Sequence, residues 1–425
     1  MGISYIVYGI YGEKYIMWDG CNYFSPVLQK GEFMRFPRGR MTADTLMQVF
    51  AVAAWHFGCV DPAIIGALQG FGCTFWTVLF YLLAVLVCIR HKRTDYAKMV
   101  LIFACMNITF KGLFLQMEST LGVALFLLQF VIVLLWETKK ESTYNRLILA
   151  LSLACSIHMN EYFLLWDLLL ISIIMWRLFG ERKIEKNWGV IIAFLIVNIA
   201  VCWTDIKANG AEAAGMNPLL QLRLAFYNKE YAVSCILIVL ILLLCVNNSP
   251  KWKIMGVIAL TLVLTVYQIH WYRKEAMVIG MWAFPTRLTC LGWSLLGTFA
   301  IALIHFRSKK TVLFSKTLII LCICLCLTTV FFNRRTGHEY RNYNTRRVVM
   351  CVINPDRGYL DCKETEIGNY SFNVEGTMRL ECLELLAMRG IKEINTVLTD
   401  KKIGNDVNVD FSRYGITIKK ECFQD

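Results

Sequence analysis

The segment PAIIGALQGFGCTFWTVLFYLLAVLVCI, residues 62–89, decides the fold class of this chain. It contains no charged side chain, and it exceeds the ~20 apolar residues that a helix needs to cross the hydrocarbon core of a bilayer. The basic run Arg90, His91, Lys92 and Arg93 follows directly, as is typical of the cytoplasmic end of a membrane span. We therefore predict that this segment crosses a membrane.

Further apolar blocks have the length of membrane spans or half-spans. They lie at 2–17, 99–110, 121–136, 147–157, 162–175, 188–203, 231–246, 254–269, 278–306 and 317–332. Hydrophobic residues make up 57% of the chain and charged residues 18%, against about 45–50% and about 25% in soluble domains. The sequence predicts an all-α polytopic membrane protein with about eleven transmembrane helices, and it excludes a water-soluble globule.

Basic residues divide the loops into two classes. The short loops at 90–98, 137–146, 177–187, 247–253 and 307–316 are rich in Lys and Arg. The positive-inside rule places these loops in the cytoplasm. We therefore expect a multi-pass protein of the inner or plasma membrane, with a cytoplasmic N-terminus and an extracytoplasmic C-terminus. The formal net charge of +13 follows from these loops, and we expect the lipid bilayer and no nucleic acid as a partner.

The predicted domains are a membrane part, 1–333, and an extracytoplasmic α+β tail, 334–425. In the membrane part, the outer loop 18–60 is mixed in character and predicts amphipathic helices that lie at the membrane surface.

The tail predicts a helix over 377–389, with Gly390 as its C-cap, and strands over 347–353, 396–398 and 415–418. Its four cysteines are Cys351, Cys362, Cys382 and Cys422. Outside the cytoplasm these thiols can form disulfides, whose connectivity the sequence leaves open.

Charged and polar residues gather at the predicted outer ends of the spans. They are Asp19, Arg38, Arg40, Glu118, His158, Asn160, Glu161, Arg273, Lys274 and Arg287. Carboxylates supply a general base or metal ligands, and Arg and Lys side chains bind phosphate. This pattern predicts a pocket that binds an anionic lipid headgroup and activates an acceptor hydroxyl.

Structural roles are the alternatives for several of these residues. Glu118 is suited to the N-terminus of a helix, and His158 can pair with Glu161. Arg273 and Lys274 can be anchors that extend to the membrane surface. We expect a further acidic residue, Asp205, to be a solvated loop residue.

The pattern resembles the GT-C glycosyltransferases, integral membrane enzymes that use polyprenyl-phosphate sugars. Trp18-Asp19 follows the first span directly, the segment 58–62 enters a long span, and Glu118 precedes the fourth span. Asn160-Glu161 after a short helix and the motif at 285–287 are similar to those of bacterial membrane proteins from surface-polysaccharide gene clusters. The resemblance covers about residues 1–330. The chain has one acidic residue, Asp19, where many members have an acidic pair.

The resemblance implies inverting transfer of a sugar from a polyprenyl-phosphate donor to a glycan or lipid-linked acceptor. It implies catalytic roles for Asp19, Glu118 and Glu161. Substrate-binding roles are implied for Arg38, Arg40, His158, Asn160, Arg273, Lys274 and Arg287. A divalent metal ion is an open option, and no residue is assigned to one. A transporter or flippase of lipid-linked saccharides is one alternative function, and a polysaccharide polymerase or ligase is another.

Overall fold

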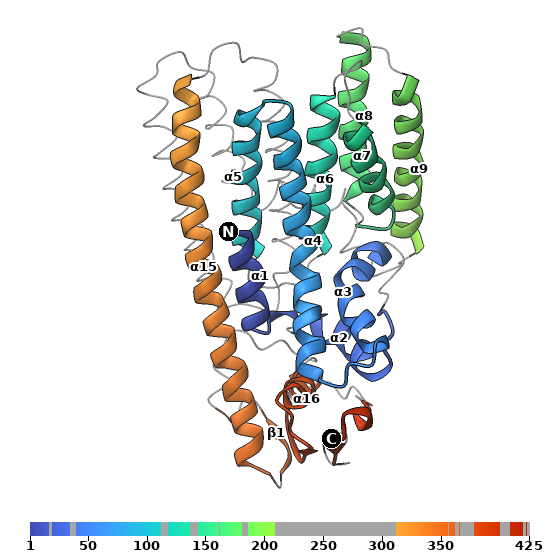
Figure 1. Cartoon of the computed structure of the whole chain (residues 1–425). Helices are drawn as coiled ribbons and strands as arrows, with labels where there is room; N and C mark the ends of the chain where they lie inside the picture. Colours follow the sequence, from blue (N-terminus) through green and yellow to red (C-terminus); the bar gives the residue numbers. More distant parts are fainter. Residues whose placement is uncertain are drawn as a thin grey trace.

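The computed structural model describes residues 1–16, 19–34, 40–111, 118–136, 143–160, 162–180, 186–208, 312–355, 357–361, 365, 378–399, 409–419 and 422. This part is mainly helical (Figure 1). Its helices are α1 (Gly2–Tyr11), η1 (Lys14–Ile16), α2 (Asp19–Lys30), α3 (Met41–His56), α4 (Pro62–Arg90), α5 (Thr94–Lys111), α6 (Glu118–Leu135), α7 (Thr143–Ser156), α8 (Phe163–Gly180), α9 (Lys186–Ala208), α15 (Val312–Ile353), α16 (Met378–Met388) and η6 (Ser412–Tyr414). The predicted spans at 231–246, 254–269 and 278–306 lie outside the described residues.

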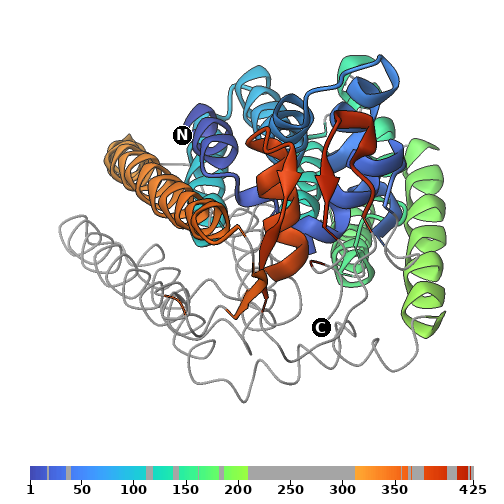
Figure 2. The ribbon, with the colours of Figure 1, turned by 90° about the horizontal axis from the view of Figure 1, so that it is seen from below.

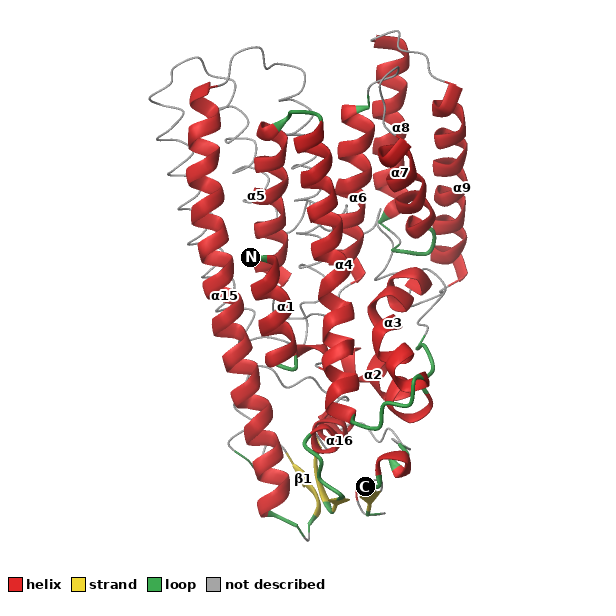
Figure 3. Ribbon diagram, in the orientation of Figure 1, coloured by secondary structure: helices red, strands yellow, loops and turns green. Residues whose placement is uncertain are grey.

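The long helices form a bundle, and α2, α3 and α16 lie at one end of it (Figures 1 and 3). Helix α4 is central, because α1, α3, α5 and α6 all pack against it. Its start follows from local chemistry: Oδ1 of Asp61 accepts the N–H of Ala63 at 2.8 Å, and Pro62 occupies the first turn, where its missing N–H costs nothing. The predicted helix over 62–89 is confirmed.

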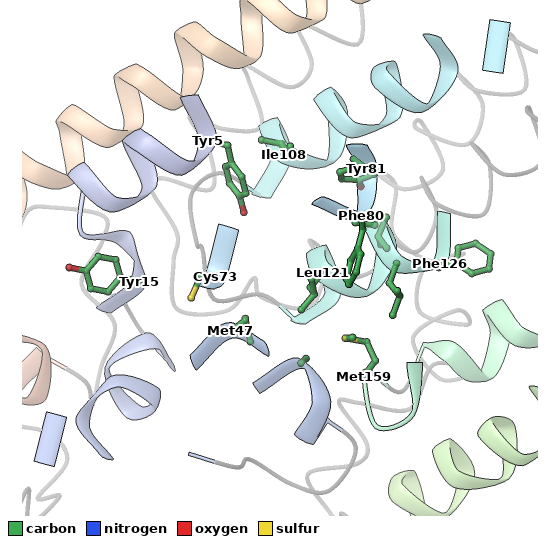
Figure 4. Close-up of a cluster of buried hydrophobic side chains, with 14 of the residues drawn as sticks. Tyr5, Tyr15, Met47, Cys73, Phe80, Tyr81, Ile108, Leu121, Phe126 and Met159 are labelled. Carbon is green, nitrogen blue, oxygen red and sulfur yellow. The ribbon is translucent and has the colours of Figure 1, made fainter. Parts of the chain in front are cut away.

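The packed core joins segments that are distant in the sequence. Figure 4 shows Tyr5 of α1, Cys73 and Phe80 of α4, Leu121 of α6 and Met159 around one buried region. Close packing of α3 on α4 depends on Gly72, because a Cβ at this position would lie 2.1 Å from the carbonyl oxygen of Met47.

The apolar blocks at 99–110, 121–136, 147–157, 162–175 and 188–203 are confirmed as helices, with ends that differ by a few residues. The helices predicted in loop 18–60 are present in its described residues as α2 and α3. The first apolar block is different. Helix α1 has 10 residues and a length of about 15 Å, so it is too short to span a bilayer by itself.

Two described helices, Pro62–Arg90 and Asn187–Ala208, are long and apolar enough to cross a membrane. Large apolar side chains are also exposed on the outer helices, among them Leu151, Phe179, Val190 and Leu327. These four side chains lie on α7, α8, α9 and α15.

Helix α15 bears on two expectations. It runs for 42 residues without a break, so the predicted domain boundary at 333/334 falls inside a helix. The strand predicted over 347–353 is wrong. Its β-branched residues favour a strand locally, but Tyr343, Arg347 and Cys351 lie four residues apart and are buried together. Tertiary packing of this helical face outweighs the weaker strand preference.

The described residues of the tail combine α16 with four short strands, and Figure 2 shows them in front of the end of the bundle. Strand β1 (Gly358–Asp361) pairs in parallel with β3 (Thr396–Thr399), and β2 (Glu393–Ile394) with β4 (Thr417–Ile418). The predicted helix over 377–389 and the strand at 396–398 are confirmed, whereas the strand predicted over 415–418 is limited to Thr417–Ile418, because Gly415 is the C-cap of η6. Gly390 has φ +72°, as expected of a C-cap.

Candidate functional site

The turn between α7 and α8 positions two of the predicted site residues, His158 and Asn160. The N–H of Met159 donates to the carbonyl oxygen of Ser156 at 3.2 Å, which tightens the end of α7. His158 adopts the left-handed backbone conformation, with φ +53°. Oδ1 of Asn160 accepts the N–H of Tyr162 at 3.0 Å, as Asn does where a helix begins. Local hydrogen bonds therefore hold the turn in one geometry.

His158 contacts a carboxylate from α9. Its Nδ1 lies 2.8 Å from Oδ2 of Asp205. The Asp205 side chain is 5% exposed and the His158 side chain 32% exposed. The prediction that Asp205 is a solvated loop residue is wrong, because α9 continues to Ala208 and turns Asp205 toward His158. A carboxylate at Nδ1 orients an imidazole and favours the tautomer whose Nε2 can accept a proton.

Helix α3 contacts the same turn. The N–H of Thr42 donates to the carbonyl oxygen of His158 at 3.1 Å, and Oγ1 of Thr42 donates to the carbonyl oxygen of Ile157 at 2.5 Å. Arg40, two residues before Thr42, is buried at the N-cap of α3. The backbone that follows Arg40 is therefore hydrogen-bonded to the backbone at Ile157 and His158.

Helix α6 packs on the turn as well. A Cβ at Gly122 would lie 3.3 Å from Cζ3 of Trp166 and 3.7 Å from Cβ of Asn160. Glu118 is the first residue of α6, one helical turn before Gly122. We call the residues Arg40, Thr42, His158, Asn160 and Asp205 the turn site, and Glu118 lies on the α6 segment that packs beside it. The predicted site residues Arg40, Glu118, His158 and Asn160 come from three separate segments that meet here.

Asp19 is the first residue of α2, and the structure describes its backbone. Helix α2 packs on η1, α3, α4 and α16. Of these elements, α3 contacts the turn site through Thr42. The predicted site residues Arg38, Glu161, Arg273, Lys274 and Arg287 lie outside the described residues.

A second polar cluster was not predicted from the sequence. Glu13 is buried and has φ +54°. Arg389 donates to its two carboxylate oxygens at 2.5 and 3.0 Å, and Arg341 of α15 donates to the same carboxylate. Nδ2 of Asn344 lies 3.4 Å from Oε2 of Glu13. We call these four residues the Glu13 clamp. It joins the N-terminal segment, α15 and the end of α16.

A third feature is the buried carboxylate of Asp167 in α8. Nδ2 of Asn198 donates to Oδ2 of Asp167 at 2.7 Å and lies 3.4 Å from Oγ of Ser156. Within the described part of the chain, Oδ1 of Asp167 has no hydrogen-bond partner. The signal in the sequence is a single acidic residue inside an apolar helix, which is a functional candidate by default in a membrane protein.

The described residues contain no group of three or more His, Cys, Asp or Glu side chains that could hold a metal ion. The side chains at the turn site can supply proton transfer and hydrogen bonding through the imidazole and carboxylate, and cationic binding through arginine. No protein-family model, no curated protein and no solved structure matches the chain.

Proposed function

We propose that this protein is a multi-pass membrane glycosyltransferase that transfers a sugar from a polyprenyl-phosphate donor to an acceptor hydroxyl on the extracytoplasmic face. The observation that carries the proposal is the turn site. Its His158–Asp205 pair lies where the starts of α3 and α6 pack on the α7–α8 turn. Arg40, Glu118 and Asn160 come from segments that the resemblance to GT-C enzymes singles out.

The exposed face of α15 supports the membrane part of the proposal. Ile319, Ile323, Leu327 and Phe331 are exposed and lie four residues apart, so they form one apolar stripe. Arg334 and Arg335 then begin a charged surface. A stripe of this kind is stable in lipid, whereas the arginines require water or headgroups. We infer that the outer boundary of the bilayer crosses α15 near Phe331.

The proposed reaction needs a base and an anion-binding group. Asp19 takes the proton of the acceptor hydroxyl as its oxygen attacks the anomeric carbon and the phosphate leaves. The departing phosphate carries the negative charge, so cationic groups stabilise the transition state; we assign this role to Arg273, Lys274 and Arg287. His158, oriented by Asp205, binds the donor at the turn site, together with Arg38, Arg40 and Asn160. Glu118 and Glu161 supply further carboxylates.

Asp19→Asn tests the catalytic assignment. The purified variant, reconstituted in vesicles, is assayed with a panel of labelled polyprenyl-phosphate hexoses and the cell's own glycan fraction as acceptor. Loss of transfer with an unchanged melting temperature supports the proposal. Transfer at the parent rate contradicts a base role for Asp19. A variant chain that still moves lipid-linked saccharide across the membrane, or still polymerises it, points to a flippase or to a polymerase that depends on arginine.

A further inference from the structure

Two thiols meet where the end of α15 packs on α16. Cys351 lies in the last turns of α15 and Cys382 in the first turns of α16, and both are free and buried. Both side chains belong to one buried cluster where α15 packs on α16, and a hydrogen bond between them contributes to the pKa shift of each thiol. Leu398 of β3 belongs to the same cluster, and both α15 and α16 pack on β3. The pair is therefore held by three elements of the fold.

A buried arginine lies beside this pair. Arg347 is one helical turn before Cys351, and Nη2 of Arg347 lies 2.8 Å from Oε2 of Glu381, the neighbour of Cys382 in the chain. The same Nη2 is 3.5 Å from the carbonyl oxygen of Met378. These contacts, which do not depend on the cysteines, show that α15 and α16 are in direct contact at the level of the two thiols.

The surroundings favour a thiolate at Cys382. Burial by itself raises the pKa of this thiol. The hydrogen bond from Cys351, the charge of Arg347 and the Leu398 backbone together lower it by more than burial raises it, so the pKa of Cys382 is below its ordinary value. Cys351, the hydrogen-bond donor, keeps its proton, and its pKa is raised. A thiolate beside a second thiol is the arrangement that thiol–disulfide exchange uses.

We propose that Cys351 and Cys382 are a redox pair that closes reversibly into a disulfide joining the end of α15 to α16. The Cys382 thiolate attacks a sulfur of a small disulfide, such as oxidised glutathione, and displaces one glutathione thiolate. Cys351 then loses its proton and attacks Sγ of Cys382, which displaces the second. The protein loses two electrons and two protons, and oxidised glutathione becomes two reduced glutathione molecules.

The location of the pair sets the rate and the reversibility. Both side chains are buried, so exchange requires α16 to separate transiently from α15. Arg347 and Leu398 stabilise the reduced thiolate, and a stabilised reduced form makes a disulfide easier to reduce. The bond therefore responds to the surroundings and is not a permanent crosslink. This inference does not depend on the proposed sugar transfer.

Thiol trapping tests the proposal with the full chain in detergent. The protein is equilibrated with oxidised glutathione, blocked with iodoacetamide, reduced, labelled with N-ethylmaleimide and digested for mass spectrometry. We expect N-ethylmaleimide on Cys351 and Cys382 together. Cys382→Ser leaves Cys351 blocked by iodoacetamide. The matched control Cys422→Ser, which removes a buried tail thiol bonded to the carbonyl oxygen of Ile394 at 3.6 Å, leaves the pair oxidised.

The role of Arg347 is tested by the double variant Arg347→Gln, Glu381→Gln, which removes both charges of the ion pair and strands neither. At a fixed ratio of reduced to oxidised glutathione, we expect the disulfide fraction to rise, by about tenfold in the disulfide-to-dithiol ratio for each pKa unit that Arg347 contributes. A disulfide between Cys382 and Cys362 in the parent protein would overturn the proposal. So would iodoacetamide on both thiols after equilibration in mild denaturant, which opens the α15–α16 contact.

Discussion

The guanidinium of Arg389 donates two hydrogen bonds to the carboxylate of Glu13, a residue 376 positions earlier in the chain. With Arg341 on the same carboxylate, the tail and α15 are both bound to the N-terminal segment. Removal of one partner from a buried ion pair leaves the other charges uncompensated, and this costs more than the intact pair contributes.

Glu13→Gln is therefore expected to lower the melting temperature and the free energy of unfolding by about 2–4 kcal/mol, at or below the usual cost of breaking a buried pair, because the two arginines are partly exposed. Limited proteolysis should also cut the tail faster. Arg335→Gln is the control, since it breaks an exposed i,i+4 pair with Glu339 that contributes at most about 0.5 kcal/mol. Equal losses in the two variants would contradict an anchoring role for Glu13.

The His158–Asp205 pair makes a prediction about activity. We expect Asp205→Asn and His158→Gln each to reduce sugar transfer by about 10-fold or more, and the double variant to be no worse than the worse single variant, because the two side chains act as one unit. The melting temperature should change little. Glu393→Gln, at an exposed carboxylate in β2, is the matched control. Independent, multiplicative losses would show that Asp205 does not act through His158.

Asp167 gives a stability prediction of opposite sign. Asp167→Asn keeps the shape of the side chain and a hydrogen-bond acceptor for Asn198, and it removes a carboxylate from a buried site, where charge is costly. The variant is expected to melt at the same temperature as the parent or higher. Asp167→Ala should melt earlier, because it leaves a cavity and an unpaired Asn198 amide. A large loss of activity in a well-folded Asp167→Asn protein would assign the ionised carboxylate a functional role.

Lys14 predicts a pH dependence of stability. It lies in η1, and its Nζ donates to Oγ1 of Thr336 at 2.6 Å, on the charged side of Phe331 in α15. Burial lowers the pKa of Lys14 to about 7, against a smaller opposing effect of Glu339. The unfolded chain holds this proton up to an ordinary pKa of about 10.4.

Between these two values the unfolded state binds more protons than the folded state, so the free energy of unfolding should rise with pH from about 7 to 10, by at most about 1.4 kcal/mol per pH unit. Below pH 7 the penalty of the buried charge is fully present. Lys14→Met should remove this rise and raise the melting temperature at pH 7. Chemical denaturation of both proteins at pH 7, 8.5 and 10 measures the difference. A parallel rise in Lys14→Met would assign the pH dependence to other groups.

The helices were predictable because their causes are local. Apolar runs of sufficient length predict α4 to α9, and Asp61-Pro62 marks the start of α4 through its own cap. In the tail, the apolar spacing of α16 and the glycine at 390 predict where that helix ends. The expectation that Arg40, Glu118, His158 and Asn160 gather rested on the expected side of the membrane, and the packing of α3 and α6 on the α7–α8 turn is a property of the tertiary structure.

The sequence by itself determined the helical class, the apolar blocks and the groups available for chemistry, because hydropathy, capping and charge act over a few neighbouring residues. Only the tertiary structure decided which distant residues meet. Asp205 reaches His158 because α9 runs past the apolar block, and α15 stays helical through 347–353 because Arg347 and Cys351 are buried against α16. Glu13 contacts Arg341 and Arg389 because α1 is short and the chain turns after it. Such contacts depend on long-range packing, and local preferences of about 1 kcal/mol or less cannot specify them.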